Sequence, residues 1–362
     1  MSRSFGAVAA FYDYTYRLFR PVLFRMDPEA AHTLTLALLR HAPRSRPRSD
    51  PPELQASIFG LTFSNPLGLA AGLDKDGLVT AKWEALGFGF AEIGTVTPRP
   101  QSGNPRPRIW RLEQHRALVN SMGFPSDGMD PVASRLAEPD AKSRRMRLGV
   151  NLGPNRATSP ERIPEDYAAL TRQMAALADF LVINVSSPNT SGLRDFQAPE
   201  RMRKVIETVR GAYAEIGINR PLLIKLAPDL ERLMLGEICA AAVELELAGI
   251  VATNSSLDHA ALGVASCLEG GLSGNPLKLR SRAIIAAIYQ LTRGRVPIIG
   301  VGGILSAEDA YGHLRAGASL VELYTGLIYH GPGLVGRIKS GLLDLLRQDG
   351  FRSISEAVGR GT

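Results

Sequence analysis

Two hydrophobic patterns alternate along most of the chain. Short apolar runs, rich in Val, Ile and Leu or bounded by glycine, recur eight times, and such nearly continuous apolarity is typical of parallel strands buried on both faces. Stretches with apolar residues at three- and four-residue steps separate most of the runs and predict amphipathic helices. The eight predicted strands are PLGLAA (66–71), FAEIGTV (90–96), RLGVNL (147–152), FLVINVS (180–186), PLLIKLA (221–227), GIVATN (249–254), PIIGVGG (297–303) and SLVELYTG (319–326).

Eight such alternations favour a closed barrel over a doubly wound sheet. No GxGxxG follows the first strand, which counts against a dinucleotide-binding Rossmann unit. We therefore predict an α/β fold, a (β/α)8 TIM barrel over residues 49–362, with a small N-terminal two-helix extension over residues 1–48. The predicted helices of the barrel are 164–178, 199–216, 230–248, 277–291, 307–316 and 334–346.

The N-terminal extension has a pattern that predicts two short helices. In the first, apolar and aromatic residues form one stripe. The second begins with Asp27 as a capping residue, Pro28 at the first helical position and Glu29 near the positive end of the helix dipole. A Pro/Arg-rich stretch over 41–52 is then typical of a linker. The stripe of the first helix consists of Phe5, Val8, Ala9, Tyr12, Tyr16, Phe19 and Leu23.

Composition narrows the class of protein. With 45% hydrophobic residues the 362-residue chain can bury a large core, while Cys239 and Cys267 are too few for a disulfide scaffold and lack the spacing of a metal site. We therefore expect no metal and a reducing compartment. Eight arginines and three acids give residues 1–48 a charge of +5 out of a total of +7, so the barrel lacks the spread of arginines that would indicate nucleic-acid binding. The sequence contains no run of about 18 apolar residues, so it predicts no membrane-spanning helix.

Polar side chains stand where the predicted strands end. In a TIM barrel these positions converge on the mouth at the carboxyl end of the strands, where such barrels carry their chemistry. Taken singly, each residue could merely cap a loop, but six strand ends with such groups indicate a common site. The residues are Asp74 and Lys75, Thr95, Asn151, Asn184 with Ser186 and Ser187, Lys225, and Thr253 with Asn254 and Ser255.

Two glycine-containing strand ends predict an anion site. Strand seven ends in GVGG (300–303) and strand eight in YTG (324–326). TIM barrels often hold a phosphate in the loops after these strands, although glycines also serve tight turns. No cysteine or histidine lies at a predicted strand end, which leaves Ser186 or Ser187 as the candidate base. A serine needs an enclosed hydrogen-bond network to act in that role.

Over nearly its whole length the chain resembles the dihydroorotate dehydrogenase family. The N-terminal helical pair, and a serine in NVSSPNT where soluble class 1 members have a cysteine, resemble the quinone-using class 2. The strings that carry the resemblance are DPEAAH (27–32), NPLGLAAGLDKDG (65–77), IGTVTPRPQ (93–101), NVSSPNTSGLR (184–194), IKLAPDL (224–230), VATNSSLD (251–258), GGLSG (270–274) and IIGVGGI (298–304).

The resemblance implies FMN as the cofactor. Lys225 would lie near the pyrimidine end of the flavin and favour its reduced form, while Gly303, Tyr324 and Thr325 would hold the phosphate end. The implied FMN-binding residues are Ala71, Gly72, Leu73, Asp74, Lys75, Thr95, Asn151, Asn184, Lys225, Thr253, Gly274, Gly303, Tyr324 and Thr325.

Dihydroorotate is the implied substrate and orotate the product. Ser187 would remove a proton from ring carbon 5 while carbon 6 passes hydride to the flavin. Amides suit the urea and amide edges of the ring, and Lys75 suits its carboxylate. Family members usually have Arg and Asn where this chain has Ser121 and Pro125. The implied substrate-binding residues are Lys75, Asn120, Ser121, Met122, Gly123, Phe124, Asn184, Asn189, Asn254 and Ser255.

For residues 1–48 the resemblance implies a tunnel for ubiquinone or menaquinone, with His32, Arg111 and Tyr324 at its inner end. The aromatic stripe and its arginines would dock a monomeric, peripheral protein on the anionic cytoplasmic face of the cell inner membrane. The resemblance also implies that the enzyme acts in de novo pyrimidine (UMP) biosynthesis. Two alternatives stay open. The helices could serve only as a lid on the barrel, or the enzyme could be a soluble class 1-like relative that uses fumarate or NAD.

Overall fold

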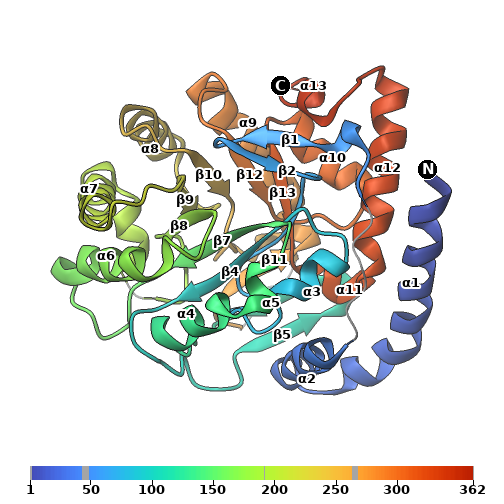
Figure 1. Ribbon diagram of the computed structural model, residues 1–362, viewed down its shortest axis with the longest axis horizontal. Helices are drawn as coiled ribbons and strands as arrows, with labels where there is room; N and C mark the ends of the chain where they lie inside the picture. The colour runs from blue at the N-terminus through green and yellow to red at the C-terminus, as the bar shows by residue number, and fades with distance from the viewer. Residues whose placement is uncertain (1, 43–48, 191, 263–267, 362) are drawn as a thin grey trace.

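Eight parallel strands form a closed barrel at the centre of the molecule (Figure 1). The computed structural model describes residues 2–42, 49–190, 192–262 and 268–361. Around the barrel the strands follow one another in chain order, and β13 pairs with β3 to close it. All eight predicted strands are confirmed, as β3 (Leu67–Leu69), β4 (Phe90–Val96), β7 (Arg147–Leu152), β8 (Phe180–Asn184), β9 (Leu222–Leu226), β10 (Gly249–Ala252), β12 (Ile298–Val301) and β13 (Leu320–Leu323).

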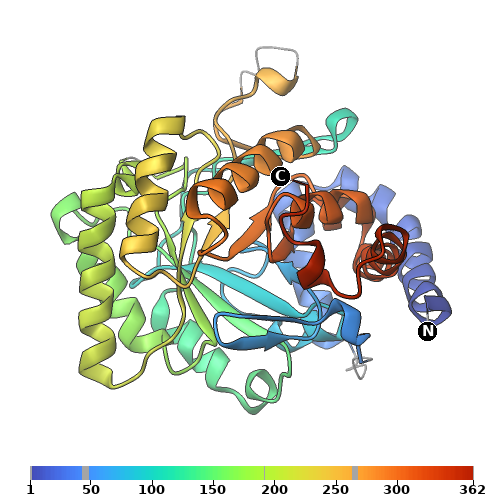
Figure 2. The ribbon, with the colours of Figure 1, turned by 90° about the horizontal axis from the view of Figure 1, so that it is seen from above.

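Helices surround the barrel on all sides, as the view from above in Figure 2 shows. The six helices predicted for the barrel are confirmed, with ends that differ from the prediction by at most four residues. The helices of the barrel are α3 (Thr80–Ala85), α4 (Met129–Ala137), α5 (Pro139–Lys142), α6 (Ile163–Met174), α7 (Pro199–Ile216), α8 (Arg232–Glu244), α9 (Lys278–Thr292), α10 (Ala307–Arg315), α11 (Thr325–His330), α12 (Gly333–Asp349) and α13 (Ile354–Ala357). Short 3₁₀ helices are η1 (Pro52–Leu54), η2 (Glu113–His115), η3 (Pro160–Arg162), η4 (Leu193–Gln197), η5 (Ala260–Leu262) and η6 (Asn275–Leu277).

Two small antiparallel sheets, which the sequence analysis did not predict, cover the two ends of the barrel. The hairpin of β1 (Ala56–Ile58) and β2 (Leu61–Phe63) lies at the amino end of the strands. At the carboxyl end, β5 (Ile109–Leu112) pairs with β6 (Ala117–Asn120), and β6 also pairs with β11 (Gly271–Gly274), which is about 150 residues away along the chain. The strand order is β11-β6-β5, so β6 lies in the middle.

Aromatic side chains fill the amino end of the barrel. The rings of Phe63 and Phe90 lie 5.5 Å apart, centroid to centroid, and those of Phe90 and Phe180 lie 6.3 Å apart, both edge to face. All three side chains are fully buried. Space for them depends on two glycines, because an ideal Cβ at Gly68 would lie 2.1 Å from the Phe90 ring and one at Gly149 would lie 2.3 Å from the Phe180 ring.

Two helices precede the barrel, α1 (Ser2–Arg25) and α2 (Pro28–His41), and α1 runs beside α12 (Figure 1). With 24 residues, α1 is longer than the short helix that was predicted. The predicted capping of α2 is confirmed, since Asp27 Oδ1 accepts hydrogen bonds from the backbone N–H groups of Glu29 and Ala30, at 3.0 and 2.9 Å. Residues 43–48 of the predicted linker, and Cys267, lie outside the described residues.

Polar contacts attach both helices to the barrel. The Tyr16 hydroxyl of α1 donates a hydrogen bond to the carbonyl of Ile328 in α11. In α2, the Glu29 carboxylate lies 2.6 Å from the guanidinium of the buried Arg108. Arg111 of β5 donates to the carbonyl of Met26, between the two helices, at 2.9 Å. The N-terminal helices are therefore fixed against the carboxyl end of the barrel.

The face that α1 turns to solvent differs from the predicted stripe. Tyr16 is partly buried against the barrel, whereas Tyr14, Leu18 and Val22 are 66%, 58% and 59% exposed. Phe19 of the predicted stripe is also exposed, while the side chains of Phe5, Val8 and Ala9 lie outside what the structure describes. Helix α1 thus carries apolar residues on two sides. One side packs on the protein, and the other is exposed to solvent. Within the described ranges, no helix combines enough length and apolarity to cross a bilayer.

The tight packing around the two barrel glycines can be tested by substitution. Gly68→Ala and Gly149→Ala should each lower the free energy of unfolding by about 1–3 kcal/mol, because the added methyl group overpacks an aromatic core. Chemical denaturation followed by circular dichroism measures the loss. Gly211→Ala in α7 is the matched control, since nothing lies within 4 Å of its ideal Cβ, and it should be neutral or stabilising by up to about 1 kcal/mol. Equal stability of all three variants would contradict this account.

Candidate active site

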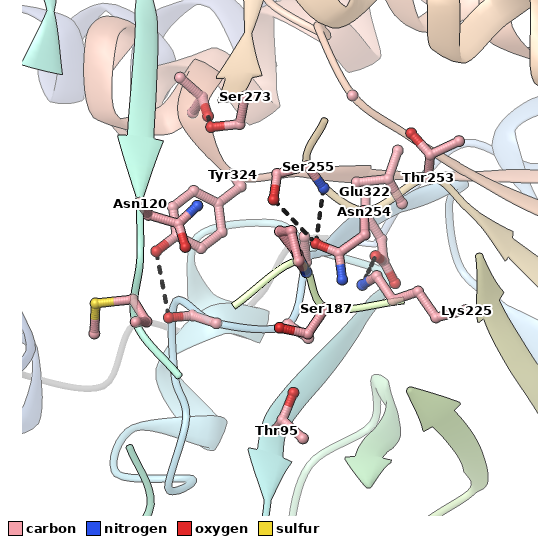
Figure 3. Close-up of a pocket in the computed structure, with 18 of the residues that line it drawn as sticks. Thr95, Asn120, Ser187, Lys225, Thr253, Asn254, Ser255, Ser273, Glu322 and Tyr324 are labelled. Atoms are coloured by element: carbon pink, nitrogen blue, oxygen red, sulfur yellow. Dashed lines mark hydrogen bonds and ion pairs between the residues drawn. The ribbon is translucent and has the colours of Figure 1, made fainter. Parts of the chain in front are cut away.

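The carboxyl ends of the barrel strands surround one cavity (Figure 3). Thr95 from β4 and Lys225 from β9 reach it, and Thr253 follows β10. These side chains are at most 7% exposed. Asn120 of β6 and Ser273 of β11 line the opposite wall, so the small sheet completes the cavity that the barrel begins. A set of polar groups on buried strand ends gives a site of fixed geometry.

A buried hydrogen-bond network holds the amides of the cavity floor. Asn184 Nδ2 donates to Thr95 Oγ1 at 3.1 Å and to Asn151 Oδ1 at 3.0 Å. Thr95 Oγ1 donates to Asn151 Oδ1 at 2.6 Å, and the Asn151 amide donates in turn to the Glu92 carboxylate. Because each member is buried and paired, the network fixes which polar atom of Thr95 and Asn184 faces the cavity.

Lys225 lies between two buried carboxylates. Its Nζ is 3.1 Å from Glu92 Oε1 and 3.7 Å from Glu322 Oε2. Burial alone would lower the pKa of Lys225, but the negative charges of Glu92 and Glu322 outweigh it and raise that pKa above its ordinary value. Burial, together with the charge of Glu92, raises the pKa of Glu322 well above its usual range. The floor therefore holds a charged lysine, whose positive charge is countered first by Glu92.

The two candidate serines have different surroundings. Ser186 Oγ donates to Asn184 Oδ1 and accepts from Asn254 Nδ2, both at 2.9 Å, so its hydroxyl is used within the wall. Ser187 lines the cavity, is 4% exposed, and its Oγ accepts a hydrogen bond from the Asn189 backbone N–H at 3.2 Å. Of the two serines that the sequence left open, Ser187 is the one on the cavity.

Further amides line the mouth of the cavity. Asn189 Nδ2 donates to both the backbone carbonyl and the side-chain oxygen of Asn120, each at 3.1 Å. Asn254 Oδ1 accepts from the backbone N–H of Ser255 at 2.7 Å. These contacts orient amide groups around the space next to Ser187, as recognition of a flat ring with polar edges requires.

One end of the cavity is lined by backbone. Gly302 and Gly303 have φ of +118° and +71°, and an ideal Cβ at Gly303 would lie 2.4 Å from the Cα of Lys278. Gly274 has φ +96°, and Thr325, which begins α11, lies beside it. Only glycine fits these positions, so main-chain atoms form this wall, which is how proteins cradle phosphate groups.

Lys75 lines this cavity and a second one beside α2. Burial lowers the pKa of Lys75 to about 8, with smaller opposing effects from Asp76 and Glu29. His32 of α2 lines the second cavity, its Nε2 lies 2.6 Å from the Leu73 carbonyl, and burial followed by the charge of Lys75 lowers its pKa to about 4. The described residues include no group of three His, Cys, Asp or Glu side chains placed to hold a metal ion.

Most of the residues predicted for the site share this one cavity. Those that line it are Ala71, Gly72, Lys75, Thr95, Asn120, Met122, Gly123, Phe124, Asn184, Ser187, Asn189, Lys225, Thr253, Asn254, Ser255, Gly274, Gly303, Tyr324 and Thr325. Of the residues implied for FMN and dihydroorotate, Leu73, Asp74, Asn151 and Ser121 do not line it, and the candidate base Ser186 does not line it either.

Each of the polar residues outside the lining has other partners. The Asp74 carboxylate accepts from the backbone of Leu78 and Val79 and from the Trp83 indole, so it supports the start of α3. Asn151 supports the floor from behind. Ser121 accepts from Asn104 Nδ2 through its carbonyl at 3.1 Å. Of the residues expected near the quinone, Tyr324 lines the main cavity, His32 lines the second one, and Arg111 contacts the junction of α1 and α2.

Comparison with known proteins decides the family. A family model described as dihydroorotate dehydrogenase matches residues 53–346. A curated dihydroorotate dehydrogenase (quinone) from Rhodospirillum rubrum is 48% identical over 355 residues, covering 95% of this chain and 94% of its own. The chain belongs to the dihydroorotate dehydrogenase family. Another relative with the same name, from Acidithiobacillus ferrooxidans, is 46% identical and covers 95% of this chain and 99% of its own.

Solved structures from the dihydroorotate dehydrogenase family have the same fold. The enzyme of Eimeria tenella in complex with ferulenol superposes with a TM-score of 0.88 at 38% identity, covering 92% of this chain and 95% of that one. Its ligand-free form gives a TM-score of 0.87 at the same identity.

The sequence analysis missed two buried carboxylates at this site, as well as Ser273 on the opposite wall of the cavity. Glu92 and Glu322 stand inside the apolar runs FAEIGTV and SLVELYTG. A carboxylate within a strand that is buried on both faces needs a partner. That signal was present in the sequence, although the identity of the partner, Lys225, depends on the closed barrel.

The charge balance at the floor of this family member predicts a large effect on stability. Lys225→Met should lower the free energy of unfolding by about 3–5 kcal/mol at neutral pH, because it leaves a buried carboxylate without its counterion. Urea denaturation measures the loss. Adding Glu92→Gln to that variant should recover most of the stability, since the uncompensated charge is then gone. A cost below about 1 kcal/mol for Lys225→Met alone would be incompatible with a buried ion pair.

Proposed function

We propose that this chain oxidises dihydroorotate to orotate with FMN and passes the electrons to a membrane quinone, as a step of de novo pyrimidine biosynthesis. Family membership makes it an oxidoreductase, and the curated relatives carry the name dihydroorotate dehydrogenase (quinone). The observation that carries the proposal is the single cavity that joins Lys75, Ser187 and Lys225 with an amide cluster at one end and a glycine wall at the other.

The cavity residues fit FMN by their chemistry. Lys225, Thr253 and the amide of Asn184 supply donors and acceptors for the polar ring end of a flavin, and the backbone around Gly274 and Gly303 suits a phosphate. When bound, FMN supplies the hydride acceptor. The residues of the chain supply the rest: they hold the ring, exclude water and carry charge next to it.

Substrate binding and proton removal belong to the opposite side of the cavity. The ammonium of Lys75 attracts the carboxylate of dihydroorotate, and the amides of Asn120, Asn189 and Asn254 match the polar edges of its ring. Ser187 then takes the proton from carbon 5. Its enclosure and its fixed contact with the Asn189 backbone hold the hydroxyl in place for this role.

Electron transfer to the membrane depends on residues 1–48 in this proposal. Tyr14, Leu18 and Val22 form an exposed apolar face on α1, and Leu34 and Leu38 are 40% and 63% exposed on α2. We expect this surface to insert at the boundary between headgroups and acyl chains of the cytoplasmic membrane face, with the nearby arginines on anionic lipid. The quinone would then pass between these helices and the barrel toward His32, Arg111 and Tyr324.

The first test is reduction of the bound flavin. Purified protein should be yellow and should bleach when dihydroorotate is added anaerobically, and Ser187→Ala should slow this bleaching by roughly 10² to 10⁴ while FMN stays bound. Stopped-flow absorbance measures the rate.

Two variants make the serine test specific. Ser187→Cys keeps a group that can accept a proton and should be faster than Ser187→Ala. Ser134→Ala, on the exposed side of α4, should bleach at the normal rate. Near-normal bleaching of Ser187→Ala would place the base elsewhere, and a colourless protein that binds no FMN would refute the proposed function.

The second test separates membrane docking from chemistry. Leu18→Glu together with Val22→Glu should weaken binding to anionic vesicles at least about tenfold, because two apolar side chains no longer bury in the interface. A flotation assay measures binding. Leu233 is 76% exposed on α8, which lies on the opposite side of the molecule from α1 (Figure 1). Leu233→Glu is the matched control and should bind normally. Equal binding of the helix variant and the control would favour the alternative that α1 and α2 only cover the barrel.

A further inference from the structure

Glu322 is a buried acid that the proposed mechanism does not use. It stands on β13, is 1% exposed, and lines the cavity next to Lys225 (Figure 3). Neither of its carboxyl oxygens has a hydrogen-bond partner among the described residues, and its distance of 3.7 Å from Lys225 Nζ is too long for a hydrogen bond. A buried carboxylate in this state would be costly, so its protonation state needs an explanation.

Charge balance at the cavity floor supplies that explanation. Glu92 from β4 and Lys225 from β9 are the charged groups that face Glu322, while its register partners on β12 and β3 are Val301 and Gly68. With both carboxylates ionised, the floor would carry one uncompensated negative charge in the barrel interior. With one of them protonated, the floor is neutral.

The contacts indicate which carboxylate holds the proton. Glu92 Oε1 accepts from Lys225 Nζ at 3.1 Å and from the Asn151 amide, and both donors stabilise its ionised form. For Glu322 the nearest such donor is Lys225 Nζ at 3.7 Å, which is beyond hydrogen-bond distance. Burial and the neighbouring charge of Glu92 favour the neutral form of Glu322, and its raised pKa agrees with this assignment.

We infer that Glu322 is held as a neutral carboxylic acid, so that the charge of Lys225 is balanced by Glu92 alone. Glu322 thereby sets the affinity for reduced FMN relative to that for oxidised FMN. The inference rests on the proposed flavin function. An ionised Glu322 would add a negative charge at the end of the cavity where Lys225 favours the reduced, more negative flavin. A neutral Glu322 therefore keeps the affinity for reduced FMN high relative to that for oxidised FMN.

Infrared spectroscopy of the holoenzyme tests the protonation directly. At neutral pH the wild-type protein should show the carbonyl stretch of a protonated carboxylic acid that is absent from Glu322→Gln. Reduction of the flavin should shift this band, because a charge change in the cavity acts on a neighbouring neutral acid. Absence of the band would overturn the inference, and so would a band that does not move on reduction.

The reduction potential of the bound flavin provides a second readout, because it reports the ratio of the affinities for reduced and oxidised FMN. A merely structural role of Glu322 would not produce the differences between variants given below. Glu322→Gln replaces one neutral group by another, so the ratio of affinities for reduced and oxidised FMN should stay within about threefold of wild type. Glu92→Gln with Glu322→Gln leaves Lys225 unbalanced and should raise the ratio at least about tenfold. A rise of that size in Glu322→Gln alone would show that Glu322 is ionised and would contradict the inference.

Failure of this inference differs from failure of the proposed function. Protein that isolates without flavin and takes up none would refute the flavin function, and the infrared band would then still decide the protonation of Glu322. A flavoprotein that is bleached by dihydroorotate but lacks the band leaves the proposed function intact and removes only the role of Glu322.

Discussion

Closure of the barrel is the constraint on which the site depends. Because β13 pairs with β3, no strand of the barrel has a free edge, and every strand is buried on both sides. Closure also brings the ends of all eight strands to one rim. Groups that are far apart along the chain, such as Glu92 and Lys225, then meet in the interior at 3.1 Å. The same paired backbone that stabilises the fold thus sets the distances within the site.

The two ends of the barrel have opposite chemistry. At the amino end, Phe63, Phe90 and Phe180 fill the interior with edge-to-face rings. At the carboxyl end, a lysine, carboxyl groups and amides occupy the corresponding space. Burial of these polar groups is tolerated because nearly every one has a partner within the network. The aromatic end stabilises the fold, and the polar end can keep an arrangement that stability alone would not favour.

Much of the fold could be predicted from the sequence because the signal is local. Apolar runs identified all eight barrel strands, and Asp27 with Pro28 identified the start of α2. The small sheet of β5, β6 and β11 was missed because its strands are short and its third strand comes about 150 residues later. For the site, strand ends and motif strings gave most of the cavity lining. The partners of Glu92 and Glu322, and the outward face of α1, depend on how elements pack, which residue spacing alone does not determine.

The contact of Tyr16 with α11 has a mechanical consequence. Tyr14 and Leu18 of α1 face solvent, while Tyr16 of the same helix is hydrogen bonded to the carbonyl of Ile328. Thr325, one helical turn earlier in α11, lines the cavity. A force applied to the outer side of α1 therefore reaches the wall of the cavity through α11, by way of Tyr16 and of the edge-to-face contact of Phe24 with Tyr329.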